Sequence, residues 1–202
     1  MGAEAPEPAE PPCLLRGSVT FGSFNAAQKL NAAIFRKLNV RYSTGRRKAC
    51  QSPKESIEQG LASCTGLSIL LVDACRSVGV PARVAGTPLW ANGRGNHTWV
   101  ELWDGHWRFT GAAEPDPAGL DRGWFAADAA NAQKDSPQHA IYAASFRKTA
   151  THFPLVWARR NTSVPAENVT DRYTKAAAPA GDTVRVLVRV VDAAKRRVAV
   201  AV

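Results

Sequence analysis

Long apolar runs are missing from this sequence of 202 residues, which excludes a transmembrane helix. The first twelve residues, "MGAEAPEPAEPP", lack the basic and apolar stretches of a secretion signal, so none is expected. The cysteines, at positions 13, 50, 64 and 75, include no CxxC pair and no zinc-ligand spacing. No acidic loop of the EF-hand type is present. We therefore expect neither a metal nor a cofactor, and the cellular compartment stays open.

The charge balance is basic. The net charge is +9, and part of the excess lies in two clusters at residues 46–48 and 195–197. Neither cluster carries interleaved aromatic residues or a known nucleic-acid module, so we expect no nucleic-acid partner. An acidic substrate or an anionic surface remains compatible with this charge. The content of 45% hydrophobic and 21% charged residues is typical of a globular protein.

Composition divides the chain into four parts. Residues 1–20 are rich in Pro, Glu and Ala and are expected to be disordered. Residues 21–173 form the predicted main domain, and "TKAAAPAGD" at 174–182 forms a linker. Residues 183–202 alternate as strands and predict the start of a truncated β-domain. The alternative is a hairpin added to the main sheet.

Helix signals occur in the first half of the main domain. Apolar spacing predicts a helix that starts after Ser23 or Asn25 and includes Leu38. "SPKE" at 52–55 is a capping box that opens a short helix, which Gly60 ends. Residue 63 is the expected N-cap of a further helix over 64–78. Its predicted apolar stripe consists of Leu67, Leu70, Leu71, Ala74 and Val78.

The cysteines at the two ends of that helix differ in expected role. Cys64 and Cys75 share nearly one helix face but lie roughly 16 Å apart along the axis. That distance is beyond disulfide reach, so Cys75 is predicted to be a buried packing residue. Cys64 follows the N-cap, where unpaired N–H groups and the helix dipole stabilise a thiolate.

A β-hairpin is the clearest strand signal. "HTWVELW" and "HWRFTGA" flank Asp104-Gly105, a preferred pair for a two-residue turn. Such a turn places Leu102 opposite Trp107 and Glu101 opposite Arg108, which separates an apolar face from a charged face. Downstream, residues 117–135 are expected to form a loop with a "GWF" anchor. Residues 136–146 are expected to open a helix or carry a strand, and 151–160 a further strand.

The hairpin also supplies a candidate base and a candidate carboxylate. His97 falls on the face of Glu101, and Glu114 lies diagonal to it if the strand continues. Asp116 has the same parity but lies beyond Pro115, which makes it the reserve. Cys64, His97 and one of these carboxylates would form a nucleophile, a base and an orienting group.

Four stretches of this sequence resemble the transglutaminase-like superfamily, whose core belongs to the papain-like thiol enzymes. They are "GLASCTG" at 60–66, "ACRSVGVPARV" at 74–84, "NHTWVELW" at 96–103 and "HWRFTGAAEPDP" at 106–117. The resemblance implies an α+β fold in which the nucleophile helix packs on an antiparallel β-sheet. It also implies that Cys64 is the nucleophile and His97 the base. The family usually places an Asp four positions after the second strand's Trp, where this chain has Gly111.

Two further residues are weaker candidates. Gln59, five positions before Cys64, is either a donor to an oxyanion, as in papain-like enzymes, or a surface residue. Trp99 shares the face of His97 and either shields a histidine–carboxylate bond from water or packs across the strands.

Three classes of function fit these observations. The leading hypothesis is a cysteine peptidase or amidase that acts on peptides or proteins through a Cys64 acyl-thioester. With an amine acceptor in place of water, the same chemistry gives a protein-glutamine transglutaminase. The third reading is a catalytically inactive binding module, since the expected Asp is missing at 111. The sequence leaves the oligomeric state open.

Overall fold

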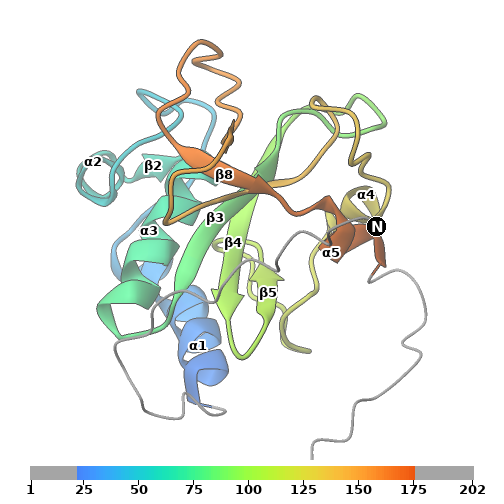
Figure 1. Cartoon of the computed structure of the whole chain (residues 1–202). Helices are drawn as coiled ribbons and strands as arrows, with labels where there is room; N and C mark the ends of the chain where they lie inside the picture. The colour runs from blue at the N-terminus through green and yellow to red at the C-terminus, as the bar shows by residue number, and fades with distance from the viewer. Residues whose placement is uncertain (1–21, 176–202) are drawn as a thin grey trace, which may run out of the picture.

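The computed structural model describes residues 22–175 (Figure 1). Helices in this range are α1 (Gly22–Lys37), α2 (Pro53–Gln59), α3 (Cys64–Ser77), α4 (Ala126–Ala130) and α5 (Thr170–Lys175). Strands are β1 (Arg41–Tyr42), β2 (Leu61–Ala62), β3 (Ala82–Thr87), β4 (His97–Trp103), β5 (Trp107–Thr110), β6 (Tyr142–Ala144), β7 (Thr151–His152) and β8 (Pro165–Asn168). No helix within these residues has the length and apolar character needed to cross a membrane.

The main sheet is antiparallel, which confirms the predicted α+β class. Within the described range its strand order is β5-β4-β3-β6-β8-β7, and β1 and β2 form a separate parallel pair. Helices α1 and α3 lie on one side of β3 and β4 (Figure 1). Val84 and Val100 pair on that side. The core there includes Phe35, Leu67, Leu70, Leu71, Val72, Val80, Val100 and Leu102.

The opposite face of the sheet is strongly aromatic. Arg83, Ala85 and Thr87 alternate onto it from β3, opposite Glu101, Trp99 and His97 of β4. A second core covers this face, with Trp90, Trp99, Phe125, Ile141, Val169 and Tyr173 among its members. Helix α3, which starts at Cys64, therefore packs on one face of the sheet, whereas the His97 ring belongs to the other.

The predicted hairpin exists, but its predicted register is wrong by one residue. Glu101 pairs with Phe109 rather than with Arg108. The turn spans residues 104–106, closed by a 3.0 Å hydrogen bond from the Asp104 amide to the His106 carbonyl. Gly105 adopts a φ of 80°, which suits a three-residue connection. An extra residue in the turn shifts every pair, so the charged cross-strand pair predicted at 101 and 108 does not form.

The sequence predicted the starts of α2 and α3 correctly. Ser52 and Glu55 form both bonds of the capping box, and Gly60 ends α2 with a φ of 67°. Helix α3 begins at Cys64 as predicted, but Val78 is exposed because the helix has ended and Val80 packs inward instead.

Five elements were not predicted: β1, β2, α4, β8 and α5. The strand expected at 151–160 is limited to β7, since Pro154 cannot donate to a ladder. Helix α5 continues through Lys175 and crosses the predicted domain end at 173. The segments 1–20 and 183–202, and most of the predicted linker at 174–182, lie outside the described residues.

Candidate active site

Cys64 is the first residue of α3, behind a well-formed N-cap. Ser63 has extended backbone angles, and its side-chain oxygen accepts a hydrogen bond from the Gly66 amide at 3.5 Å. The same hydroxyl donates to the Ala49 carbonyl at 2.7 Å, which ties the loop before α2 to the helix start. Half-buried Cys64 thus lies where free amide N–H groups and the helix dipole favour negative charge.

The segment before Cys64 is fixed by a buried hydrogen bond and by close packing against α3. Gln51 is buried and donates from Nε2 to the Leu61 carbonyl at 2.9 Å. Gly66 faces Ala62 so closely that a Cβ at position 66 would lie 3.0 Å from the alanine methyl group. A larger residue at 66 would therefore push the first turn of α3 away from β2.

A buried hydroxyl pair connects the helix start to the strand that carries His97. Thr65 Oγ1 and Thr98 Oγ1 lie 3.0 Å apart, and Ser68 Oγ donates to the Thr98 carbonyl at 3.2 Å. Thr65 follows Cys64 and Thr98 follows His97 in the chain. Although no hydrogen bond joins the Cys64 thiol to the His97 ring, their immediate neighbours are bonded to each other.

The His97 ring is enclosed by aromatic side chains. Only 8% of the residue is exposed. The ring centroids of Trp124 and Phe125 lie 4.7 and 4.9 Å from that of His97, and Trp99 stacks at 5.8 Å. Burial lowers the pKa of His97 to about 4, so the imidazole is neutral at pH 7. Its Nε2 atom is buried without a hydrogen-bond partner in the described structure.

The strand that was expected to continue toward Glu114 instead turns back at Gly111. Asn31 of α1 holds this turn: its Nδ2 donates to the Gly111 carbonyl and its Oδ1 accepts from the Ala113 amide, both at 2.8 Å. Glu114 then pairs with Gly111 as an isolated bridge. The diagonal placement predicted for Glu114 is therefore wrong, but the turn brings its carboxylate over Gly111. A Cβ on Gly111 would lie 2.6 Å from Glu114 Oε2.

The Glu114 carboxylate accepts a hydrogen bond from Trp124 Nε1 at 2.9 Å. Burial raises the pKa of Glu114, and the indole N–H opposes that rise because it stabilises the ionised form. No hydrogen bond or ion pair joins Glu114 to His97 in this arrangement. Trp124 contacts both residues: it bonds the carboxylate through Nε1 and places its ring against the imidazole.

Asp116, the reserve carboxylate, and Gln59, the candidate oxyanion donor, each have partners in neighbouring loops. Asp116 accepts from the Ala118 amide at 2.8 Å and pairs with Arg122 at 3.5 Å. Gln59 accepts from the Arg47 amide at 3.1 Å through Oε1, which fixes the basic loop at 46–48. Among residues 22–175, no group of three or more His, Cys, Asp or Glu side chains could hold a metal ion.

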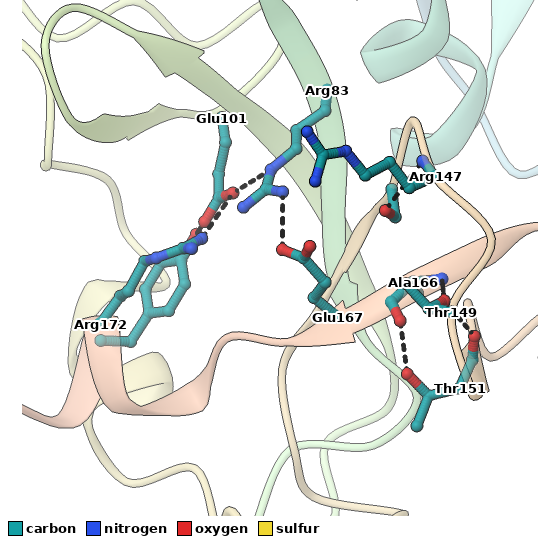
Figure 2. A network of polar contacts seen from close by, with 10 residues as sticks. Arg83, Glu101, Arg147, Thr149, Thr151, Ala166, Glu167 and Arg172 are labelled. Carbon is teal, nitrogen blue, oxygen red and sulfur yellow. Dashed lines mark hydrogen bonds and ion pairs between the residues drawn. The ribbon is translucent and has the colours of Figure 1, made fainter. Parts of the chain in front are cut away.

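Trp99 lies under His97 and is fully buried. Its Nε1 donates to the Tyr173 hydroxyl at 2.8 Å, and that hydroxyl donates to Glu101 Oε1 at 2.9 Å. Figure 2 shows the Glu101 carboxylate between Arg83 and Arg172. Arg83 Nε lies 2.7 Å and Arg172 Nη1 lies 3.4 Å from Glu101 Oε2. The Trp99 ring is thus held by a polar network that runs through Tyr173 to Glu101.

The described cysteines differ in their surroundings. Cys50, Cys64 and Cys75 are all free thiols. Burial of Cys75 raises the pKa of its thiol to about 11, as suits the predicted packing residue. Cys50 is exposed.

A family model described as transglutaminase-like superfamily matches residues 20–129. The chain belongs to this superfamily. The matched range of this transglutaminase-like chain contains Cys64, His97, Glu114 and Trp124, whereas α5 with Tyr173 lies beyond it.

Two solved structures are similar to this transglutaminase-like chain. One is a candidate cysteine protease from Cytophaga hutchinsonii, with 21% identity, a TM-score of 0.37 and coverage of 69% of this chain. The chain spans 50% of that protein's length. The other is calcium-bound LapG from Legionella pneumophila, with 15% identity, a TM-score of 0.38, and coverage of 75% of this chain and 78% of that one. No curated protein matches the sequence.

Sequence reasoning missed Trp124 and Tyr173 as neighbours of the site. Trp124 belongs to the "GWF" segment, for which residue types indicated only an aromatic anchor. Tyr173 lies 74 positions from its partner Trp99. Contacts at such separations depend on how segments fold back, which local periodicity does not encode.

Proposed function

We propose that this chain is a thiol-dependent acyl-transfer enzyme that hydrolyses peptide or protein amide bonds through Cys64. The observation that carries the proposal is the Thr65–Thr98 bond, which holds the capped start of α3 beside the strand start of a neutral His97. Membership of the superfamily supports a thiol enzyme in general.

The reaction begins when neutral His97 takes the proton of the Cys64 thiol. The thiolate sulfur attacks the carbonyl carbon of the amide, and the N–H groups at the start of α3 stabilise the negative oxygen. His97 then gives its proton to the leaving nitrogen, the C–N bond breaks, and an acyl-thioester remains on Cys64. Water, deprotonated by His97, attacks the thioester, releases the carboxylic acid and restores the thiol.

Glu114 is the proposed orienting group for His97. It is the carboxylate whose side chain occupies the space beside Gly111, whereas Asp116 is bonded to its own loop and to Arg122. An ionised Glu114 close to His97 would raise the low pKa of the imidazole and stabilise the imidazolium that forms during the reaction.

The unpartnered His97 Nε2 favours a second candidate, a catalytically inactive binding module. A peptide library incubated with and without a lysine-like amine, and read by mass spectrometry, separates the readings. Hydrolysis that Cys64→Ala abolishes and Cys50→Ala retains supports the proposal. Amine-linked products indicate a transglutaminase, and no product from any peptide indicates the inactive module.

A further inference from the structure

Near the candidate active site, the carboxylate of Glu114 lies beside Gly111, which has no side chain. Gly111 is where the superfamily resemblance leads one to expect an acidic side chain, and Glu114 Oε2 occupies the position beside it. A Cβ at 111 would meet that oxygen at 2.6 Å and the Glu114 Cβ at 3.2 Å. The space for the Glu114 carboxylate therefore exists only because residue 111 has no side chain.

The Glu114 carboxylate, which follows the turn at Gly111, is hydrogen-bonded to Trp124. The indole donates to Glu114 Oε2 at 2.9 Å, yet 59% of Trp124 is exposed. Here the ring lies 4.7 Å from His97 and 5.8 Å from Phe125, edge-on to the latter.

The backbone around Trp124 is itself fixed. A Cβ on Gly123 would lie 2.9 Å from the buried Phe125 ring, so the chain passes directly against that ring. Upstream, the Asp121 amide donates to the Phe109 carbonyl, and the Asp121 carboxylate accepts from the Phe109 amide at 2.9 Å. These bonds join the loop to β5 three residues before Trp124.

We propose that Trp124 is a positioning residue that holds the relocated Glu114 carboxylate for His97, in place of the acidic side chain missing at position 111. This inference rests on the proposed function. The indole N–H sets where the carboxylate lies and favours its ionised form. The indole ring closes the histidine off from solvent on that side.

Other charged groups of the same loop face one another. Asp116 pairs with Arg122, and Asp121 pairs with Arg108 at 2.7 Å. From α1, neutral Gln28 and Asn31 contact the 110–116 segment. From β4, His97 is a titratable residue whose ring lies against that of Trp124. The causes of the shifted pKa of Glu114 are its burial and the indole hydrogen bond.

The test is a double-mutant cycle. Trp124→Phe keeps an aromatic ring but removes the N–H donor. It is made in the wild type and in the exchange variant Gly111→Asp/Glu114→Gly. In the wild type, Trp124→Phe is expected to lower kcat about tenfold. It is also expected to move the acid limb of the kcat/KM pH profile to higher pH, because loss of the indole donor raises the pKa of Glu114. In the exchange variant, whose carboxylate starts from residue 111, the same substitution should change neither appreciably. Trp103→Phe, at the far end of the hairpin, is the matched control.

Equal losses in both backgrounds would overturn the proposal, since the effect of Trp124 would then not depend on a carboxylate at residue 114. An unchanged pH profile would overturn it too. A readout independent of activity is the pKa of the Glu114 carboxyl, followed by carbon NMR in Cys64→Ala. It should rise when Trp124→Phe is added, and an unchanged pKa contradicts the inference. If the wild type shows no Cys64-dependent activity, the proposed function fails, and this NMR result still decides the contact.

Discussion

The hydroxyl oxygens of Thr65 and Thr98 lie 3.0 Å apart in the interface between α3 and β4. Each residue follows one member of the proposed catalytic pair. Both are buried, so neither hydroxyl has water as an easy alternative partner. This bond therefore couples the position of Cys64 to that of His97, and it can be altered without touching either residue.

Thr98→Val should lower both activity and stability. The variant leaves the Thr65 hydroxyl buried without its partner, which costs about 1–3 kcal/mol of unfolding free energy. Adding Thr65→Val removes the orphaned hydroxyl and should recover part of that stability, while kcat stays low. Urea unfolding and steady-state kinetics on the three variants check this. Full additivity of the two stability losses would show that the hydroxyls do not interact.

Glu114→Gln should lower kcat far more than Asp116→Asn. Glu114 lies beside the turn at Gly111, whereas Asp116 is bonded to the Ala118 amide and Arg122. Kinetic comparison of the two variants at pH 7 separates the candidates. If Asp116→Asn is the more damaging change, the orienting role moves to Asp116.

Stability should fall with acidification because of His97. In the unfolded chain a histidine takes up a proton near its ordinary pKa of 6.5, whereas folded His97 stays neutral down to about 4. The contribution of neutral His97 to the free energy of unfolding is fully present above pH 6.5. It falls by up to about 3 kcal/mol as the pH drops to 4. Glu114 acts in the opposite direction, since burial raises its pKa.

Urea unfolding of the wild type and of His97→Gln between pH 7 and pH 4 isolates the histidine contribution. The variant should lose less stability over that interval, whatever its absolute stability. Parallel curves for the two proteins would mean that His97 is not held neutral by burial.

Tyr173→Phe should destabilise the aromatic face of the sheet. The hydroxyl bridges Trp99 Nε1 to Glu101 Oε1, and both partners are buried. Its loss leaves two orphaned polar atoms, so we expect a cost of about 2–4 kcal/mol. Tyr42→Phe, at an exposed position, is the control. Equal thermal stabilities for the two variants would argue against the bridge.

Local signals in the sequence were sufficient to predict helix α3, which starts at Cys64. Ser63 is a residue type that caps helices, and the apolar spacing after Cys64 has helical period. Each signal involves neighbours within one turn, where backbone geometry follows from residue type. The capping box at Ser52 and Glu55 was predictable for the same reason.

The position of the carboxylate was not predictable in the same way. One extra residue in the turn at Gly105 moved the register of the whole hairpin. The reversal at Gly111 depends on Asn31, which is 80 positions away. The alternation along β5 that led to Glu114 therefore does not continue in the structure. The hydrogen bond from Trp124, ten positions after Glu114, depends on how the loop between them folds, which residue types alone do not give.

The most direct test of the central claim is the alkylation rate of Cys64. In Cys13→Ser/Cys50→Ser, the thiols left are Cys64 and Cys75, and burial raises the pKa of Cys75 to about 11, so it should not react near neutral pH. We predict that iodoacetamide modifies Cys64 at pH 7 several-fold faster than a free cysteine of ordinary pKa, and that His97→Ala slows the reaction. A Cys64 that reacts no faster than free cysteine, with or without His97, would contradict the assignment of Cys64 as an activated nucleophile.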